Sequence, residues 1–294
     1  MLTNQTDWHE ERRRGIGSSD AAAVLGLSHW KSCLELYAEK IGLGDPEEDK
    51  PDWLYWGAKL EPVIAERYME ETGRTLIDPG RTFVQWSKEY PFMCATIDRE
   101  IWDDKRRLEG VLEIKTASGF KAKEWTEEPP VEYQIQIQHQ MIVTGCHWGS
   151  FAVLIGGQQF LWCDVEKNEK FCDYLIQQEW EFWKRVEAKD PPPPGDPAES
   201  AHEALQRLYP KDTGETIALP GEFIDLADRL ENLKATRKDA EDAIKKLENE
   251  LRAAIGDASF GVLPNGVTFS LRTVPRKGYE VKATECRTLR RMKV

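Results

Sequence analysis

The 294-residue sequence contains no run of about 18 apolar residues, so it offers no candidate for a membrane-spanning helix. Its opening segment, MLTNQTDWHEERRR, passes from polar to charged residues without the apolar stretch of a signal peptide. Its six cysteines lie far apart, with no CxxC pair and no histidine at zinc-finger spacing. These absences disfavour a membrane protein, a disulfide framework and a zinc module, and they predict a cytoplasmic protein.

Positive charge is also scarce, because 40 basic residues face 52 acidic ones and leave a net charge of −12. This balance argues against a protein that coats nucleic acid through bulk positive charge, although a local basic groove is compatible with it. The stretch from Arg272 to Val294 is the exception, with eight basic residues against two acidic ones. The sequence therefore predicts a basic tail on an acidic protein.

Composition is otherwise ordinary, with 40% hydrophobic and 31% charged residues, and the length predicts one large domain or two. The proline-rich segment DPPPPGDP cannot continue a helix and favours an extended backbone, so it is the best candidate for a linker. We therefore expect a core over residues 1–189, a linker over 190–198 and a C-terminal arm over 199–294.

The order of the helices and strands that periodicity predicts implies a mixed α/β core. Ser18 or Ser19 is a candidate cap for the first predicted helix. Runs rich in β-branched and aromatic residues predict a three-stranded meander between residues 81 and 116, and a later hairpin turns at Gly156 and Gly157. Helices are expected over residues 18–25, 31–41, 59–72, 132–144 and 169–188.

The arm has a sharper pattern, because apolar residues follow one another at alternating spacings of three and four. This spacing predicts a long helix with a heptad seam, followed by a small hairpin around Asn265 and Gly266. Two alternatives stay open for the seam: self-association as a coiled coil, or packing against its own domain. The seam positions are Phe223, Leu226, Leu230, Leu233, Arg237, Ala240, Ile244, Leu247, Leu251 and Ala254.

The strongest site signal is Asp98 on one predicted strand, followed by Glu113 and Lys115 on the next. Because strand side chains alternate between faces, Glu113 and Lys115 point to the same side, and a hairpin brings Asp98 opposite them. Carboxylates and the carbonyl of Ile114 are ligands that Mg²⁺ prefers, and the lysine ammonium can stabilise charge on a phosphate. This combination is typical of phosphodiester hydrolysis.

Five segments occur in the order seen in phage recombination exonucleases: RRRGIGSSDAAAVLGLSHWKSCLELYAEKIG, WGAKLEPVIAERYMEETG, CATIDREI, LEIKTAS and YQIQIQHQMIVTG. The sequence thus resembles the lambda exonuclease family of YqaJ-type viral recombinases, within the PD-(D/E)XK nuclease superfamily. The resemblance covers roughly residues 8–185. It implies a PD-(D/E)XK core fold, with a central mixed β-sheet flanked by helices.

The resemblance also implies roles for individual residues. Asp98 corresponds to the metal-binding aspartate, although Ile97 replaces the proline of the superfamily name, and Glu113 and Lys115 correspond to the (D/E)xK pair. Glu61 corresponds to a helical glutamate that supports the metal site, and Gln136 to a helical glutamine beside the metals. The implied cofactor is Mg²⁺, with two ions and with Mn²⁺ as a substitute.

A terminal 5′-phosphate would bind at Arg13, Ser19 and Thr96 by the same resemblance, with Arg14 as the alternative to Arg13. Independently, an arginine beside a serine at a helix N-terminus suits an anion.

The implied function is 5′-to-3′ digestion of linear double-stranded DNA, which leaves 3′ single strands for recombination. The resemblance further implies a ring-shaped homotrimer and a single-strand annealing protein as partner. Other functions stay open: an endonuclease on the same fold, an inactive DNA-binding or coiled-coil adaptor, and a carbohydrate enzyme. The lysine argues against a carbohydrate enzyme, because glycosidases do not need it.

Overall fold

The computed structural model describes residues 5–44, 52–275, 278 and 289, and its contacts divide the chain into two compact units, Met1–Pro210 and Lys211–Val294. The first unit therefore extends beyond the predicted linker at 190–198. Among the described helices, none combines the length and apolarity that crossing a membrane requires. The five cysteines in the described ranges are free thiols, and Cys286 lies outside those ranges.

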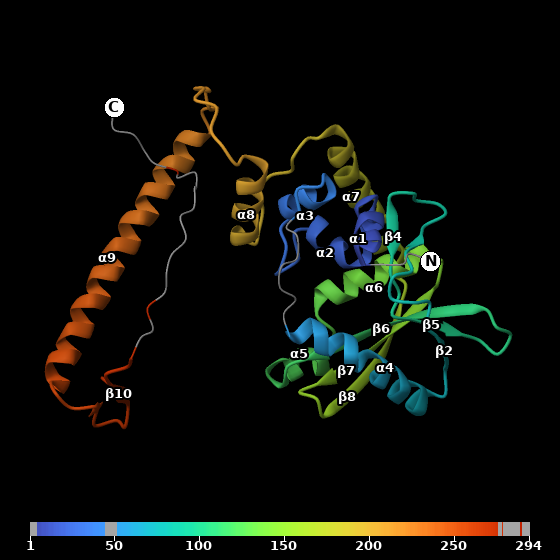
Figure 1. The fold of residues 1–294 in the computed structure, drawn as a ribbon, viewed down its shortest axis with the longest axis horizontal. Coiled ribbons are helices and arrows are strands. Elements are labelled where there is room, and N and C mark those ends of the chain that lie inside the picture. The colour runs from blue at the N-terminus through green and yellow to red at the C-terminus, as the bar shows by residue number, and fades with distance from the viewer. Residues whose placement is uncertain (1–4, 45–51, 276–277, 279–288, 290–294) are drawn as a thin grey trace. The chain divides into compact units, whose positions relative to one another are not determined.

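The first unit is built on a five-stranded sheet in the order β2-β5-β6-β7-β8 (Figure 1). The central strands β6 and β7 run parallel, whereas every other neighbouring pair is antiparallel, so the sheet is mixed, as the family resemblance implies. The hairpin of β7 and β8 confirms the turn expected at Gly156 and Gly157, which both have positive φ. The strands are β2 (Thr75–Ile77), β5 (Arg99–Trp102), β6 (Leu108–Ala117), β7 (Trp148–Ile155) and β8 (Gln159–Glu166).

Two helices cover the two faces of the central strands. Helix α4 (Asp52–Thr72) packs Ile64 and Tyr68 into a cluster that also contains Leu112 and Ile114 of β6. On the opposite face, Val111 belongs to the cluster that α6 (Val131–Thr144) joins. Since faces alternate along a strand, Glu113 and Lys115 of β6 lie on the α6 side.

The predicted three-stranded meander is wrong. Strands β3 (Gln85–Trp86) and β4 (Met93–Ala95) pair with each other in a separate small sheet, where β1 (Ile16–Gly17) runs parallel to β4. The run FMCATIDREIW therefore contributes to two sheets, because its backbone leaves β4 at Ala95 and enters β5 at Arg99. This break places Asp98 at the junction between the sheets.

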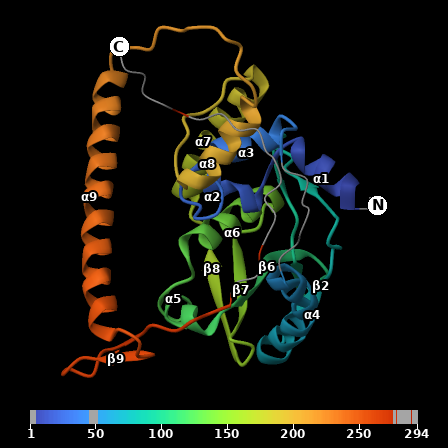
Figure 2. The ribbon, with the colours of Figure 1, turned by 60° about the vertical axis from the view of Figure 1, so that its left-hand side comes forward.

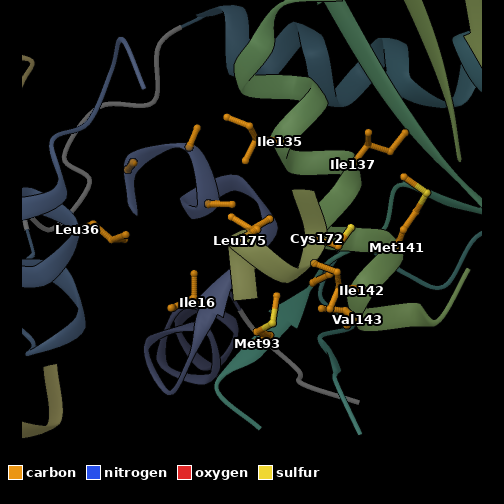
Figure 3. Close-up of a cluster of buried hydrophobic side chains, with 14 of the residues drawn as sticks. Ile16, Leu36, Met93, Ile135, Ile137, Met141, Ile142, Val143, Cys172 and Leu175 are labelled. Atoms are coloured by element: carbon orange, nitrogen blue, oxygen red, sulfur yellow. The ribbon is translucent and has the colours of Figure 1, made fainter. Parts of the chain in front are cut away.

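The largest core cluster lies between the small sheet, α6 and the N-terminal helices (Figure 3). Ile16 of β1 and Met93 of β4 are fully buried there, together with Met141 of α6. Leu175 of α7 (Glu169–Ala188) completes the contact, and α7 has the bounds that periodicity predicts. The core thus fixes α6 against both sheets, which determines where its polar side chains point.

The other helices largely match the expectations, with shifts at their ends. The predicted helix over 18–25 is a short 3₁₀ turn, η1, followed by α2. Their N-cap residues are Gly17 and Asp20, so neither Ser18 nor Ser19 is the cap, and the Asp20 carboxylate accepts a bond from the Gly17 N–H. Helix α3 is capped by the Ser32 hydroxyl. Helix α4 begins seven residues before the predicted Lys59, at Asp52. The remaining elements are α1 (Gln5–Arg13), η1 (Ser18–Asp20), α2 (Ala21–Val24), α3 (Cys33–Lys40), η2 (Gly119–Lys121), α5 (Ala122–Glu127) and α8 (Ala198–Leu208).

Helix α8 follows the proline-rich segment and packs on α3 within the first unit. The Ser32 N–H donates to the Ser200 hydroxyl at 2.9 Å, and Arg207 donates to Glu35 at 2.9 Å. Ala201 and Ala204 of α8 are buried. The proline-rich segment is therefore followed by a further element of the same compact unit.

The second unit contains α9 (Phe223–Ile255), a 33-residue helix that carries the predicted heptad seam and has no buried residue. Figure 2 shows α9 as one uninterrupted helix. The predicted hairpin is formed by β9 (Phe260–Val262) and β10 (Thr268–Ser270), with Gly266 at a positive φ. Apart from Arg272, the basic residues of the predicted tail lie outside the described ranges.

Candidate active site

The β5–β6 hairpin brings Asp98 beside the polar side chains of β6, as the sequence predicts. The register pairs Arg99 with Leu112, so Asp98, one residue earlier, lies opposite Glu113. The Asp98 carboxylate accepts a hydrogen bond from the Ile114 N–H at 2.8 Å. This bond fixes the carboxylate against the strand that carries Glu113 and Lys115.

Glu113 is the centre of a hydrogen-bonded cluster and is only 2% exposed. Its Oε1 lies 2.6 Å from the Lys115 ammonium and accepts a bond from the Gln136 amide at 2.7 Å. Its Oε2 accepts a bond from the Gln140 amide at 2.5 Å. A buried carboxylate in an apolar strand is costly without such partners, and here each oxygen has one.

Lys115 completes the cluster from the same face of β6. Its ammonium lies 3.2 Å from Gln136 Oε1 and 4.5 Å from the centre of the Tyr133 ring, which stacks on Trp125. Burial alone would lower the pKa of Lys115, but the carboxylates of Glu113 and Asp98 outweigh burial and raise that pKa. Lys115 is therefore held as a cation that faces two carboxylates.

For the Asp98 carboxyl, burial outweighs the nearby positive charge. Desolvation by the surrounding protein raises its pKa well above the usual range, and the nearby charges of Glu113 and Glu61 raise it further. Lys115 and the Ile114 N–H lower the pKa of Asp98, but not enough to reverse the shift. The cluster therefore crowds more negative charge than its one lysine balances.

Glu61 reaches this region from α4, on the other face of the sheet. Its Oε1 accepts a bond from Arg99 at 2.6 Å, and its Oε2 lies 3.1 Å from Arg81. The sequence-based expectation gave Glu61 a supporting role for metal. In the structure its carboxylate is paired with two arginines.

The donor chemistry of Asp98 and Glu113 fits a hard divalent cation, because carboxylate oxygens are the ligands that such ions prefer. A bound cation would also relieve the repulsion that raises the pKa of Asp98. Within the described ranges, however, no three His, Cys, Asp or Glu side chains are arranged to hold one ion together. The groups that fit a divalent cation are therefore the carboxylates of Asp98 and Glu113 and the backbone carbonyl beside them. The Glu61 carboxylate is instead paired with arginines.

A second polar cluster lies where α1 meets η1. Arg12 donates to the Ser19 hydroxyl at 2.6 Å and lies 3.7 Å from Asp20, and its guanidinium is 4.8 Å from the centre of the Trp8 ring. The Trp8 indole donates to the Thr96 hydroxyl at 3.3 Å. Because Thr96 is two residues before Asp98, one short segment joins the two clusters.

Only some of the predicted phosphate ligands lie together in the structure. Ser19 and Thr96 both belong to the α1–η1 cluster. Arg13 instead lies 3.6 Å from Glu10, and Arg14 lies 3.0 Å from Glu11. The arginine that contacts Ser19 is thus their neighbour Arg12.

The sequence-based prediction omits Gln140 and Arg12, although the spacing of each along its helix could have indicated it. Gln140 is four residues after Gln136, and residues at this spacing share one helix face. Arg12 is likewise four residues after Trp8. By contrast, Gln138 is two residues from Gln136 and points elsewhere, accepting from the Asn168 N–H at 2.9 Å and donating to the Glu166 carbonyl.

Comparison with known proteins gives two kinds of similarity. A family model described as YqaJ-like viral recombinase domain matches residues 7–147. The uncharacterized protein YqaJ of Bacillus subtilis strain 168 is 31% identical over 266 residues, which cover 89% of this chain and 82% of that protein.

Among solved structures, the crystal structure of an alkaline exonuclease, LHK-Exo, from Laribacter hongkongensis superposes with a TM-score of 0.53 at 20% identity. The match covers 70% of this chain and 100% of that one. LHK-Exo in complex with dAMP gives a TM-score of 0.52 at 22% identity, over 69% of this chain and 97% of that one. These likenesses confirm the predicted fold class.

Proposed function

Since the chain belongs to the YqaJ-like viral recombinase family, we propose that it is a Mg²⁺-dependent exonuclease that digests one strand of linear duplex DNA from a 5′ end. The observation that carries this proposal is the convergence of Asp98, Glu113 and Lys115 on one face of the β5–β6 hairpin. Two solved structures with a similar fold are those of an alkaline exonuclease, which supports nuclease chemistry.

Asp98, Glu113 and the Ile114 carbonyl are the groups that would hold Mg²⁺. When bound, the ion supplies Lewis acidity and a nucleophilic hydroxide at neutral pH. The side chains hold their positions through neighbours: the Ile114 N–H fixes Asp98, and Gln136 and Gln140 fix the two oxygens of Glu113. This arrangement orients the carboxylates before substrate binds.

Lys115 supplies the positive charge of the site. Its ammonium is kept protonated by Glu113 and Asp98, so it can attract the scissile phosphate and orient the attacking oxygen. The Tyr133 ring beneath it restricts the side chain without neutralising its charge. The cation thus remains available to the developing negative charge of the transition state.

Arg12, Ser19 and Thr96 support recognition of a DNA end rather than an internal site. Arg12 and the Ser19 hydroxyl lie in hydrogen-bond contact at the start of η1, and together they offer a charged fork and a hydroxyl to a terminal phosphate. The segment from Thr96 to Asp98 connects this cluster to the catalytic cluster. We infer that a 5′-phosphate bound there would direct the adjoining phosphodiester towards the carboxylates.

Other parts of the proposal rest on the family resemblance: a trimeric ring, a second Mg²⁺ ion, replacement by Mn²⁺, and a single-strand annealing protein as partner. They remain predictions.

The decisive experiment compares linear and covalently closed circular duplexes of the same sequence, with Mg²⁺ and with EDTA. We expect digestion of the linear duplex alone, only with Mg²⁺, and accumulation of 3′ single strands. Replacing Mg²⁺ by Ca²⁺ should allow DNA binding without turnover, because the larger ion relaxes the octahedral geometry. Cleavage of closed circles would make the protein an endonuclease, and digestion in EDTA would exclude the metal mechanism.

A further inference from the structure

Helix α9 of the second unit displays an apolar seam whose residues are mostly exposed in the part of the chain that the structure describes, with Leu230 and Leu251 partly buried. Leu233, Ile244 and Leu247 are each at least 57% exposed, and no residue of α9 is buried. At about 1.5 Å per residue, the 33-residue helix is about 50 Å long. A seam of this length at heptad spacing is typical of a helix that packs against another helix.

We propose that the seam binds α9 of a second copy of this chain in the antiparallel orientation. With Phe223 at heptad position a, a twofold axis between Lys238 and Asp239 aligns every seam residue with one on the second copy. The pairs are Phe223 with Ala254, Leu226 with Leu251, Leu230 with Leu247, Leu233 with Ile244, and Arg237 with Ala240.

The polar interruption of the seam favours this orientation. A parallel, in-register pair would place Arg237 against Arg237 of the second copy inside the seam, where like charges repel. In the antiparallel pair Arg237 lies across from Ala240, whose small side chain leaves room for the arginine stem to pass to solvent. Arg237 already has a partner at the surface, since its guanidinium lies 3.2 Å from Glu241 of its own helix.

The charges that flank the seam give the same orientation independently. The N-terminal half carries Arg229 and Lys234 at flanking positions g and e, whereas the C-terminal half carries Glu241, Glu248 and Glu250. The antiparallel register brings Lys234 beside Glu241 and Arg229 beside Glu250 of the second copy, and the symmetry repeats each pair. A parallel pair would instead bring Arg229 beside Lys234, which is repulsive.

The first test is the molar mass of the full-length protein in solution. If the first unit is monomeric, pairing through α9 should double the mass relative to a Leu247→Glu variant. If it forms a trimeric ring, the three arms cannot all pair within one ring, so pairing should join rings and at least double the mass. That variant places a carboxylate against Leu230 of the second copy, while its own chain loses no buried contact. Sedimentation velocity over a range of protein concentrations measures this ratio, and equal masses for the two proteins would overturn the proposal.

A charge-reversal series tests the orientation. Lys234→Glu should weaken association about tenfold, because two attractive contacts become repulsive. Glu241→Lys should weaken it similarly, and the double variant Lys234→Glu with Glu241→Lys should restore it. The matched control is Lys245→Glu, which makes the same charge change at an outward b position and should leave association unchanged.

The outcomes separate the alternatives. Stronger association of Lys234→Glu would indicate a parallel pair, because the new glutamate would face Arg229, and it would overturn the antiparallel proposal. Failure of the double variant to recover would also overturn it. Digestion of linear duplex per chain should be the same in Leu247→Glu and wild type, so an inactive wild-type protein would contradict the proposed function and leave the pairing of α9 to be judged by mass.

Discussion

Asp98 is placed where its ionised form is disfavoured, and this has opposite consequences for activity and for stability. We expect Asp98→Asn to reduce Mg²⁺-dependent digestion at least about 100-fold, since a ligand carboxylate is lost. The same change should not lower the melting temperature, because burial and the charge of Glu113 raise the pKa of Asp98 and an amide removes that repulsion. Nucleotide release and thermal unfolding measure the two effects.

Lys115→Met should show a comparable loss of activity, since it removes the cation that faces Glu113 and Asp98. Glu109→Gln is the matched control, because Glu109 is exposed on the same strand, and it should keep wild-type activity. Full activity of Lys115→Met would contradict the proposed mechanism.

Gln140 offers a way to separate the orientation of Glu113 from its charge. Its amide donates to Glu113 Oε2, whereas its own carbonyl oxygen is buried without a hydrogen-bond partner. Gln140→Leu removes the unsatisfied acceptor but leaves the buried Glu113 Oε2 without its donor, so the melting temperature should fall. We expect activity to fall about 10-fold and to recover partly at high Mg²⁺, as for other groups that hold a metal ligand. A titration of activity against Mg²⁺ concentration measures this.

Arg12 and Arg13 provide a matched pair for the DNA end. Wild-type protein should digest duplexes with a 5′-phosphate faster than duplexes with a 5′-hydroxyl. Arg12→Ala should remove this preference, because Arg12 contacts Ser19, whereas Arg13→Ala should preserve it, because Arg13 is paired with Glu10. Initial rates on the two substrates decide the matter, and loss of the preference in Arg13→Ala alone would return the role to Arg13.

At the scale of elements, α8 determines where the chain can be shortened. A protein ending at Asp190 loses the helix that covers α3 and leaves Glu35 without Arg207, which should cost about 3 kcal/mol or more of unfolding free energy. A protein ending at Pro210 keeps that packing and should retain metal-dependent digestion. Urea unfolding of the two truncated proteins should give a clearly lower midpoint for the shorter one. Equal midpoints would show that α8 contributes nothing.

Sequence periodicity predicted the long elements well and the short ones poorly. Helix α7 was predicted with its observed bounds because its apolar face repeats over five turns. Strands β1 and β3 have two residues each, which is too short for a period, and β1 is defined only by its pairing with β4 far along the chain. The meander prediction failed for this reason.

At the candidate site, too, contacts set by local sequence pattern could be predicted, whereas contacts set by tertiary packing could not. Asp98, Glu113 and Lys115 could be brought together from strand alternation and a local hairpin. The partners of Glu61 could not, since Arg99 and Arg81 reach it through packing of α4 on the sheet. Arg12 was missed because three consecutive arginines differ only in the helix face that each occupies.

At the scale of the whole molecule, the net charge of −12 opposes binding to DNA, which is itself negatively charged. The basic residues after Arg272 offer one resolution, because each phosphate contact they make releases counterions. Removal of residues 211–294 should then make the slope of log K against log salt shallower, by about 0.9 for each lost contact. Binding constants for the full chain and the protein ending at Pro210, at several salt concentrations, test this, and identical slopes would exclude a DNA-binding role for the second unit.

Because β6 pairs in parallel with β7, which lies later in the chain, the active site forms in a defined order during synthesis. The β5–β6 hairpin is local and can close as soon as Ala117 has left the ribosome, which brings Asp98 to Glu113. The amides of α6 and the neighbouring strand β7 come later, and β6 gains its second neighbour only after Ile155 has emerged. A nascent chain therefore carries its carboxylates without these partners from the emergence of Ala117 until that of Ile155, and hydrolytic competence begins with the closure of the sheet.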